Sequence, residues 1–241
     1  MNPWQTYSQD PNSPELLSLR RAAIRKARTG RLAANRVEYL CGLAAGKSVL
    51  DIGVVEHTSG AAANPGWLHG KLKLAAAHCL GVDVLEAEVA RLRQQGYDVV
   101  CADVTRAPLA QKFDLIIGGE VLEHLDSPGA FMGNCAAMLS PGGRLAITVP
   151  NPWYANVILK HLCRRTVFVD SADHVAWYDA SVLHELGQRH GLELERFTPI
   201  GGVHTRTLKG KVFFGLLPLL LWTGLSPELF AKSIIYEFVR R

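Results

Sequence analysis

The stretch Ser48-Val-Leu-Asp-Ile-Gly53 decides the fold. It is a short apolar run that ends in a polar Asp and a Gly. Runs of this length are typical of strands that are buried on both faces of a parallel sheet. Similar runs follow further along the chain, at residues 80–84, 97–101, 113–118, 144–149 and 192–198.

Helical patterns separate these strands. Apolar residues recur at helical spacing near 67–79, 86–95 and 128–139, and Asp179 can cap a helix that runs to His190. Strands that alternate with helices of about 10–15 residues form βαβ units with right-handed crossovers. We therefore expect an α/β fold, a Rossmann-like, doubly wound and mostly parallel sheet of six or seven strands with flanking helices.

The sequence divides into three parts. Residues 1–45 carry two predicted helices, at 14–28 and 31–43, that we expect to pack on or cap the core. Residues 46–200 form the predicted core, and residues 201–241 an apolar C-terminal extension.

The extension contains the run Val212 to Leu225, which is flanked by lysines and is shorter than the ~20 residues that span a bilayer. A lid or core segment, a peripheral membrane contact and a partner surface all remain open for it.

The amino-acid composition excludes some classes of function. The formal net charge is +4 and 48% of the residues are hydrophobic, so the chain can form a large core but lacks the basic character of a dedicated nucleic-acid binder. The basic residues concentrate between Arg20 and Arg31 and in the tail, which is most often a solvated helix face. Five cysteines are scattered singly, and the N-terminus is polar. We therefore expect a cytoplasmic protein without disulfides or a zinc site.

Polar residues follow the predicted strands at their carboxyl ends, where open α/β sheets bind ligands. Asp51 and Gly53 close the first strand, Asp83 the second, and Asp103 and Glu120 follow the third and fourth. A carboxylate after the second strand can accept two hydrogen bonds from a ribose diol, and Asp103 lies where an adenine amino group could bind. Gly53 allows the backbone to approach the ligand closely.

This arrangement resembles the class I S-adenosylmethionine-dependent methyltransferases over about residues 46–195. The matching stretches are Val49-Leu-Asp-Ile-Gly53, Gly81-Val-Asp83, Ala102-Asp103, Phe113-Asp114, Glu120-Val-Leu-Glu-His-Leu125 and Leu139-Ser-Pro-Gly-Gly143. The resemblance implies S-adenosylmethionine as cofactor. The cofactor-binding residues that it implies are Asp51, Ile52, Gly53, Asp83, Val84, Asp103, Val104 and Glu120.

The loop after the first strand departs from the family. The family pattern is D-x-G-x-G-x-G, whereas here Val54, Val55, Glu56 and His57 follow Gly53. Either a loop of another shape holds the cofactor, or the chain is a degenerate relative that does not catalyse. The other cofactor positions are intact, which favours the first interpretation.

Glu120, Glu123 and His124 form an E-x-x-E-H motif. On a helix these positions share one face, so the side chains can converge. The motif is similar to that of metal-assisted O-methyltransferases, namely those of the ubiquinone pathway and of small RNAs, and Asp173-His-Val-Ala-Trp177 looks like a further ligand segment. The resemblance implies Glu120, Glu123, His124 and His174 as ligands of Mg²⁺ or Mn²⁺. The alternative is a metal-free active site in which His124, His174 and Glu123 are catalytic.

The sequence leaves several chemical classes open for the acceptor of the methyl group. The stretch Trp67-Leu-His69 resembles methyltransferases found beside glycosyltransferases, which implies a sugar hydroxyl on a glycan or glycolipid. The alternatives are a quinone or other small metabolite, or a non-catalytic scaffold at a membrane. Basic residues interleaved with aromatics are not evident, so we expect no nucleic-acid partner.

Overall fold

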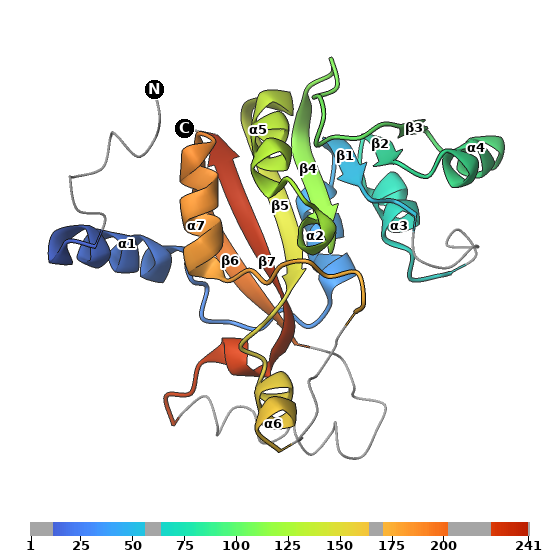
Figure 1. The fold of residues 1–241 in the computed structure, drawn as a ribbon. Helices are drawn as coiled ribbons and strands as arrows, with labels where there is room; N and C mark the ends of the chain where they lie inside the picture. The colour runs from blue at the N-terminus through green and yellow to red at the C-terminus, as the bar shows by residue number, and fades with distance from the viewer. Residues whose placement is uncertain (1–11, 56–63, 164–170, 202–222, 241) are drawn as a thin grey trace.

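The computed structural model describes residues 12–55, 64–163, 171–201 and 223–240. Their strands form one seven-stranded sheet of order β3-β2-β1-β4-β5-β7-β6 (Figure 1). The strands are β1 (Ser48–Ile52), β2 (His78–Asp83), β3 (Val99–Cys101), β4 (Phe113–Gly119), β5 (Leu139–Pro150), β6 (Leu192–Gly201) and β7 (Ala231–Arg240).

Strands β1 to β5 pair in parallel with one another, and β7 pairs antiparallel with both β5 and β6. The chain adds β2 and β3 on one side of β1 and then returns to add β4 and β5 on the other. The sheet therefore has its switch point between β1 and β4, where parallel α/β sheets open a crevice for ligands. This confirms the predicted Rossmann-like, mostly parallel sheet.

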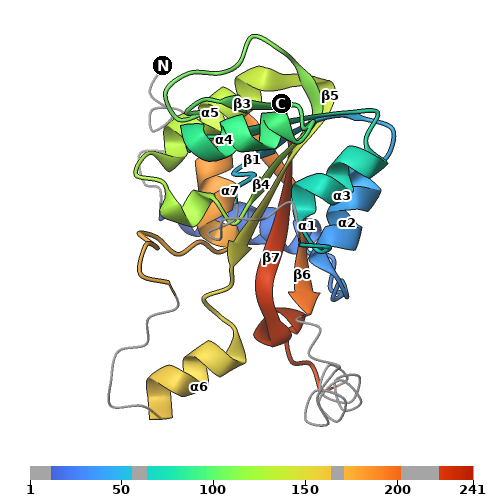
Figure 2. The same ribbon diagram turned by 90° about the vertical axis from the view of Figure 1, so that its right-hand side faces the viewer.

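Helices cover both faces of the sheet (Figure 2). Helices α5 and α7 pack on one face and α2 and α3 on the other, while α1 lies against β6 and α4 against β3. The described α-helices are α1 (Pro14–Ala27), α2 (Arg36–Ala44), α3 (Leu68–Ala75), α4 (Glu86–Gln94), α5 (Pro128–Met138), α6 (Ala155–Cys163) and α7 (Ala180–Arg189). Two short 3-10 helices, η3 (Leu122–His124) and η4 (Pro227–Phe230), complete the described elements.

Side-chain caps fix where several helices begin. Asn35 accepts from the backbone N–H groups of Val37 and Glu38, at 2.8 and 3.3 Å, and so starts α2. Asp179 accepts from the N–H groups of residues 181 and 182, at 2.9 Å each, and starts α7 as its sequence predicts. The cap at Asn35 places the start of the second helix five residues later than predicted.

The boundary predicted at residue 200 is wrong, because β7 lies inside the sheet between β5 and β6. Residues 231–240 alternate apolar and polar side chains less regularly than an exposed strand, since both faces of β7 are covered, and Tyr236 and Phe238 are fully buried. The core therefore extends to Arg240. Helix α6 stands apart from the sheet, without a buried residue.

Most of the apolar run 212–225 lies outside the described residues, so the predicted lid or membrane contact there stays a prediction. Among the helices that the structure describes, none combines the length and the apolar character needed to cross a bilayer.

Candidate active site

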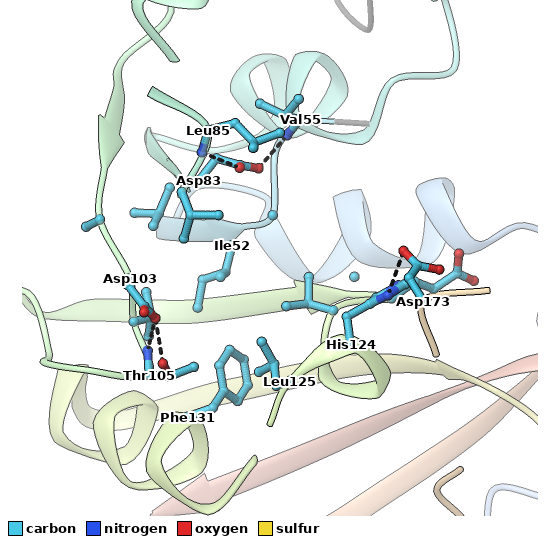
Figure 3. Close-up of a pocket in the computed structure, with 18 of the residues that line it drawn as sticks. Ile52, Val55, Asp83, Leu85, Asp103, Thr105, His124, Leu125, Phe131 and Asp173 are labelled. Carbon is cyan, nitrogen blue, oxygen red and sulfur yellow. Dashed lines mark hydrogen bonds and ion pairs between the residues drawn. The ribbon is translucent and has the colours of Figure 1, made fainter. Parts of the chain in front are cut away.

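A cleft of about 740 Å³ opens at the carboxyl ends of β1, β2 and β4, beside the switch point (Figure 3). Most of the predicted cofactor residues line it, namely Ile52, Gly53, Asp83, Val84, Asp103, Val104 and Glu120. The volume lies within the range of cofactor pockets in proteins. The topology thus brings together side chains that are up to 68 residues apart along the chain, from Ile52 to Glu120.

Asp83 organises one wall of the cleft. Its carboxylate accepts from the backbone N–H of Val55 at 2.9 Å and from that of Leu85 at 3.1 Å (Figure 3). The side chain thereby ties the loop after β1 to the loop after β2. A carboxylate can accept about four hydrogen bonds, so Asp83 retains capacity for a ligand's hydroxyl groups.

Asp103 lies at the end of the cleft beyond β3. It accepts from the Thr105 hydroxyl at 2.6 Å and from the Thr105 backbone N–H at 2.9 Å, and Arg106 pairs with it at 3.1 Å. The Thr105 hydroxyl, its backbone N–H and the Arg106 charge together hold the pKa of the Asp103 carboxyl below its usual range. Asp103 therefore presents a carboxylate, which can accept from an amino group.

Gly53 has a backbone φ of +80°, a conformation that favours glycine. A Cβ atom at this position would lie 2.5 Å from Cγ2 of Val121, on the opposite wall. Glycine is therefore required here both for its φ and for the close approach of the two walls. The predicted close approach of this backbone to a ligand stays a prediction.

Asp51 is the one predicted cofactor residue that lies outside the described lining of the cleft. It is absent from the described residues that line the cleft, and its carboxylate lies 3.1 Å from Nδ1 of His69 beneath the β1 loop. Both side chains are buried. Asp51 therefore supports the site from below and does not contact the cleft.

Glu120 also differs from prediction. Its φ is +59° and it precedes η3, so Glu120, Glu123 and His124 do not share one face of a helix. The Ser233 hydroxyl donates to Oε1 of Glu120 at 2.9 Å, and Arg36 lies 3.5 Å from its Oε2. Glu120 lines the cleft but is not part of the cluster that Glu123 and His124 form.

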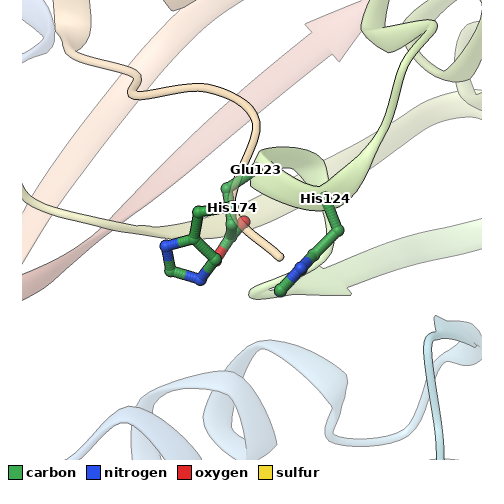
Figure 4. Close-up of side chains that lie close together, drawn as sticks. All are labelled: Glu123, His124 and His174. Carbon is green, nitrogen blue, oxygen red and sulfur yellow. The ribbon is translucent and has the colours of Figure 1, made fainter. Parts of the chain in front are cut away.

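That cluster consists of Glu123, His124 and His174, whose potential ligand atoms lie within 4.8 Å of one another (Figure 4). The His124 and His174 rings are 4.8 Å apart in an edge-to-face arrangement. The backbone N–H of Val175 donates to the carbonyl oxygen of Glu123 at 2.9 Å, which fixes the 171–179 segment against η3. This contact brings His174 to the other two residues from 50 positions away in the sequence.

The Glu123 carboxyl is buried, and neither of its oxygens has a hydrogen-bond partner among the residues that the structure describes. Burial raises its pKa to about 7, and the nearby Glu120 charge adds to the effect while Arg36 opposes it. His174 Nδ1 is likewise buried and lacks a partner within the described chain. A buried polar atom without a hydrogen-bond partner lowers the stability of the fold. Such unsatisfied groups are typical of functional sites.

Three residues of the site were not predicted from the sequence. Arg36 lines the cleft from the start of α2, and Asp173 pairs with Nδ1 of His124 at 3.1 Å. His69 lies under the β1 loop, against Asp51. Asp173 carried a signal in the Asp173-His-Val-Ala-Trp177 segment, and His69 carried one in the Trp67-Leu-His69 stretch, but neither pattern indicated the contacts that these residues make. Arg36 was one basic residue among many.

A crevice at the switch point, with acids after β2 and β3 and a close-approach glycine after β1, defines a class I S-adenosylmethionine-dependent methyltransferase. Residues 24–196 match the family model described as "Methyltransferase domain". The chain belongs to this family.

Two relatives are named as methyltransferases, and a solved structure shares the fold. The chain is 28% identical over 177 residues to a ubiquinone biosynthesis O-methyltransferase of Coxiella burnetii, covering 69% of this chain and 70% of that protein. It is 32% identical over 81 residues to the one named likewise in Bradyrhizobium sp. (strain ORS 278), a match that spans 31% of this chain and 32% of the relative's length.

Magnesium protoporphyrin IX methyltransferase from Synechocystis PCC 6803, solved with bound SAH, matches with a TM-score of 0.54 at 18% identity and covers 96% of both chains. At this identity the likeness supports the fold.

Proposed function

We propose that the enzyme O-methylates a hydroxyl group of a small diol-bearing acceptor, of the kind found among quinone precursors. The observation that carries this proposal is the Glu123–His124–His174 cluster, which adjoins the cleft at the end opposite Asp103. His124 and Asp173 line this end. An acceptor there would lie next to basic nitrogen and carboxylate atoms.

The reaction forms one bond between the acceptor oxygen and the methyl carbon and breaks the bond between that carbon and the cofactor sulfur. The hydroxyl proton must leave, and the neutral products are the methyl ether and S-adenosylhomocysteine. The sulfonium is already activated, so the protein needs to align the two groups, exclude water and take up the proton. An imidazole of His124 or His174 is suited to accept the proton.

Neighbouring side chains hold the His124 imidazole in position to accept the proton. Its Nδ1 lies 3.1 Å from an Asp173 carboxylate oxygen, so the imidazole is held on that side by a hydrogen-bonding partner. Its ring edge meets the His174 ring. The pairing fixes the orientation of the imidazole in the way that carboxylate partners orient histidines in other active sites.

The cluster also fits a divalent cation, because the two orphaned Glu123 oxygens and Nδ1 of His174 are ligand atoms that lack other partners in the described chain. Glu123, His124 and His174 would hold such an ion, which would lower the pKa of a bound hydroxyl. Two imidazoles and one carboxylate favour Mn²⁺ over Mg²⁺, since Mg²⁺ prefers oxygen ligands.

The choice of acceptor is supported by the curated relatives, which are named as ubiquinone biosynthesis O-methyltransferases. A sugar diol, which the Trp67-Leu-His69 resemblance favours, is the competing acceptor. A quinone precursor and a sugar diol both carry adjacent hydroxyls, so an assay that compares the two can identify the acceptor class.

The test uses methyl-labelled S-adenosylmethionine with catechol, whose hydroxyls are adjacent, with resorcinol, whose hydroxyls are not, and with simple methyl glycosides. We expect labelled monomethyl catechol and little product from resorcinol. Label in the glycosides alone would replace the quinone-type acceptor by a sugar. A further arm of the assay supplies simple amines, and label in the amines but in none of the hydroxyl compounds would refute O-methylation.

Variants test the cluster. Glu123→Gln and His124→Asn should each lower turnover roughly 10²-fold or more while the affinity for S-adenosylhomocysteine stays within about threefold. His161→Asn, on the exposed helix α6, is the matched control and should retain turnover. Binding of Mn²⁺, followed by electron paramagnetic resonance, reports on the cation independently of activity. Normal turnover in both cluster variants would show that these side chains take no part.

A further inference from the structure

Three residues beneath the β1 loop, Asp51, Trp67 and His69, are all buried, with 3%, 3% and 1% of their surface exposed. None of them lines the cleft within the described chain, and the proposed methyl transfer does not use them. We propose that they form a loop clamp that compensates for the glycine missing at position 55 and holds the backbone of residues 53–55 in its cofactor-binding conformation.

The first three residues of the loop are tied to β2. The backbone N–H groups of Gly53 and Val54 both donate to the carbonyl oxygen of Val82, at 2.8 and 3.4 Å. The N–H of Val55 then reaches the Asp83 carboxylate. The loop therefore leaves β1 along β2, and its backbone determines where the Asp83 carboxylate lies.

Trp67 holds this segment from below. Its indole N–H donates to the carbonyl oxygen of Val54 at 2.9 Å, and the Val54 side chain is buried against it in one apolar cluster. The Tyr97 ring meets the indole edge-to-face, with centroids 4.9 Å apart. Since residues 54 and 67 lie on either side of the loop, this hydrogen bond closes the loop at its base.

His69 and Asp51 anchor Trp67 in turn. A carboxylate can only accept, so the Nδ1–H of His69 donates to Asp51 on β1 at 3.1 Å. The His69 and Trp67 rings lie 5.3 Å apart. Through this pair, the first turn of α3 is fastened to the strand that begins the loop.

The neighbouring strand leaves room for the clamp. A Cβ on Gly81 of β2 would lie 2.8 Å from Cε1 of His69, 3.0 Å from Val54 and 2.7 Å from Val99. The His69 ring therefore occupies space that only glycine leaves free.

In the family pattern, a glycine lets the loop turn tightly at position 55. Here Val55 stands at that position, so the packing of the neighbouring Val54 and the Trp67 hydrogen bond must fix the backbone that glycine would leave adaptable. Holding residues 53–55 in place before the cofactor arrives lowers the entropic cost of binding. The clamp residues are thus positioning residues, which act on the cofactor through Val55 and Asp83.

The experiment measures the dissociation constant of S-adenosylhomocysteine by calorimetry, and the melting temperature without ligand, for His69→Leu, His69→Asn and Trp67→Phe. His69→Leu leaves the Asp51 carboxylate buried without its donor, and we expect its dissociation constant to rise roughly tenfold or more. Asn can place an amide N–H near the former Nδ1, so His69→Asn should restore the affinity to within about threefold of the wild type. Trp67→Phe keeps an aromatic ring but removes the donor to Val54, and should raise the constant by roughly threefold to tenfold.

His184→Leu is the matched control, because His184 is a buried histidine on α7, away from the cleft, whose Nε2 lies 3.0 Å from the Gln188 amide. It should lower the melting temperature and leave the dissociation constant unchanged. The clamp is refuted if His69→Leu and Trp67→Phe bind S-adenosylhomocysteine as tightly as the wild type. It is also refuted if His184→Leu weakens binding as much as they do. These measurements need no acceptor, so they stand apart from the test of O-methylation.

Discussion

Replacing Gly53 with alanine tests how the two walls of the cleft meet. Alanine at a φ of +80° carries a backbone strain of roughly 1–2 kcal/mol. Its Cβ would also lie 2.5 Å from Cγ2 of Val121, and relieving such overpacking costs about 1–3 kcal/mol. The free energy of unfolding should therefore fall by about 2–5 kcal/mol in Gly53→Ala.

A matched control separates the two contributions. Gly96 has a φ of +83°, and nothing in the described chain lies within 4 Å of the place that an alanine methyl group would take there. Gly96→Ala therefore reports backbone strain alone, about 1–2 kcal/mol. Val121→Ala removes the methyl group that Gly53→Ala would meet. In a double-mutant cycle, the pair Gly53→Ala and Val121→Ala should show a favourable coupling of about 1–3 kcal/mol.

Denaturant titration of the unliganded protein measures these changes, and thermal unfolding checks them, since about 1 kcal/mol corresponds to roughly 2–4 °C in a chain of this size. The reasoning fails if Gly53→Ala costs no more than Gly96→Ala. It fails equally if Val121→Ala brings no coupling, since the two walls would then not be in contact at this point.

Other contacts in the cleft and the core can be tested in the same way. Asp83→Asn should raise the dissociation constant of S-adenosylhomocysteine roughly tenfold by calorimetry, because the amide cannot accept as many hydrogen bonds as the carboxylate; unchanged affinity would exclude Asp83 from cofactor binding. Glu237→Gln removes the charge that partners Arg144 in the interior and should lower the free energy of unfolding by about 1–3 kcal/mol in urea titrations, whereas an unchanged midpoint would show that the pair is dispensable. Burial, and then the Arg189 charge, lower the pKa of His190 below its ordinary 6.5, so stability is lost as the pH falls below about 6.5, because the unfolded chain binds the proton more readily. His190→Gln should flatten that part of the pH–stability curve, and an identical slope in both proteins would contradict this.

Much of the core could be predicted because its signals are local. Strands β1, β2 and β4 are apolar runs bounded by turn residues, and a parallel sheet buries such runs on both faces. Strand β7 escaped prediction, although Ser233 to Phe238 is largely apolar. It follows a segment whose apolar run suggested a lid, and antiparallel pairing with strands formed much earlier in the chain leaves no mark in the sequence.

The cluster of Glu123, His124 and His174 was likewise only partly predictable from the sequence. The E-x-x-E-H spacing led to a helix with Glu120 on its active face, but the left-handed backbone at Glu120 turns that side chain toward Ser233. His174 joins Glu123 through one backbone hydrogen bond from Val175, which no spacing encodes.

By itself, the sequence determined the strand–helix alternation, the glycine and acids at the strand ends and hence the class of enzyme, because these depend on short-range patterns and on where parallel strands end. Only the tertiary structure decided that the Asp51 carboxylate lies against His69, that Glu120 lies outside the cluster of Glu123, His124 and His174, and that Arg36 lines the cleft. Those outcomes depend on which way a side chain points once distant segments have packed, and that direction is set by contacts that exist only in the folded chain.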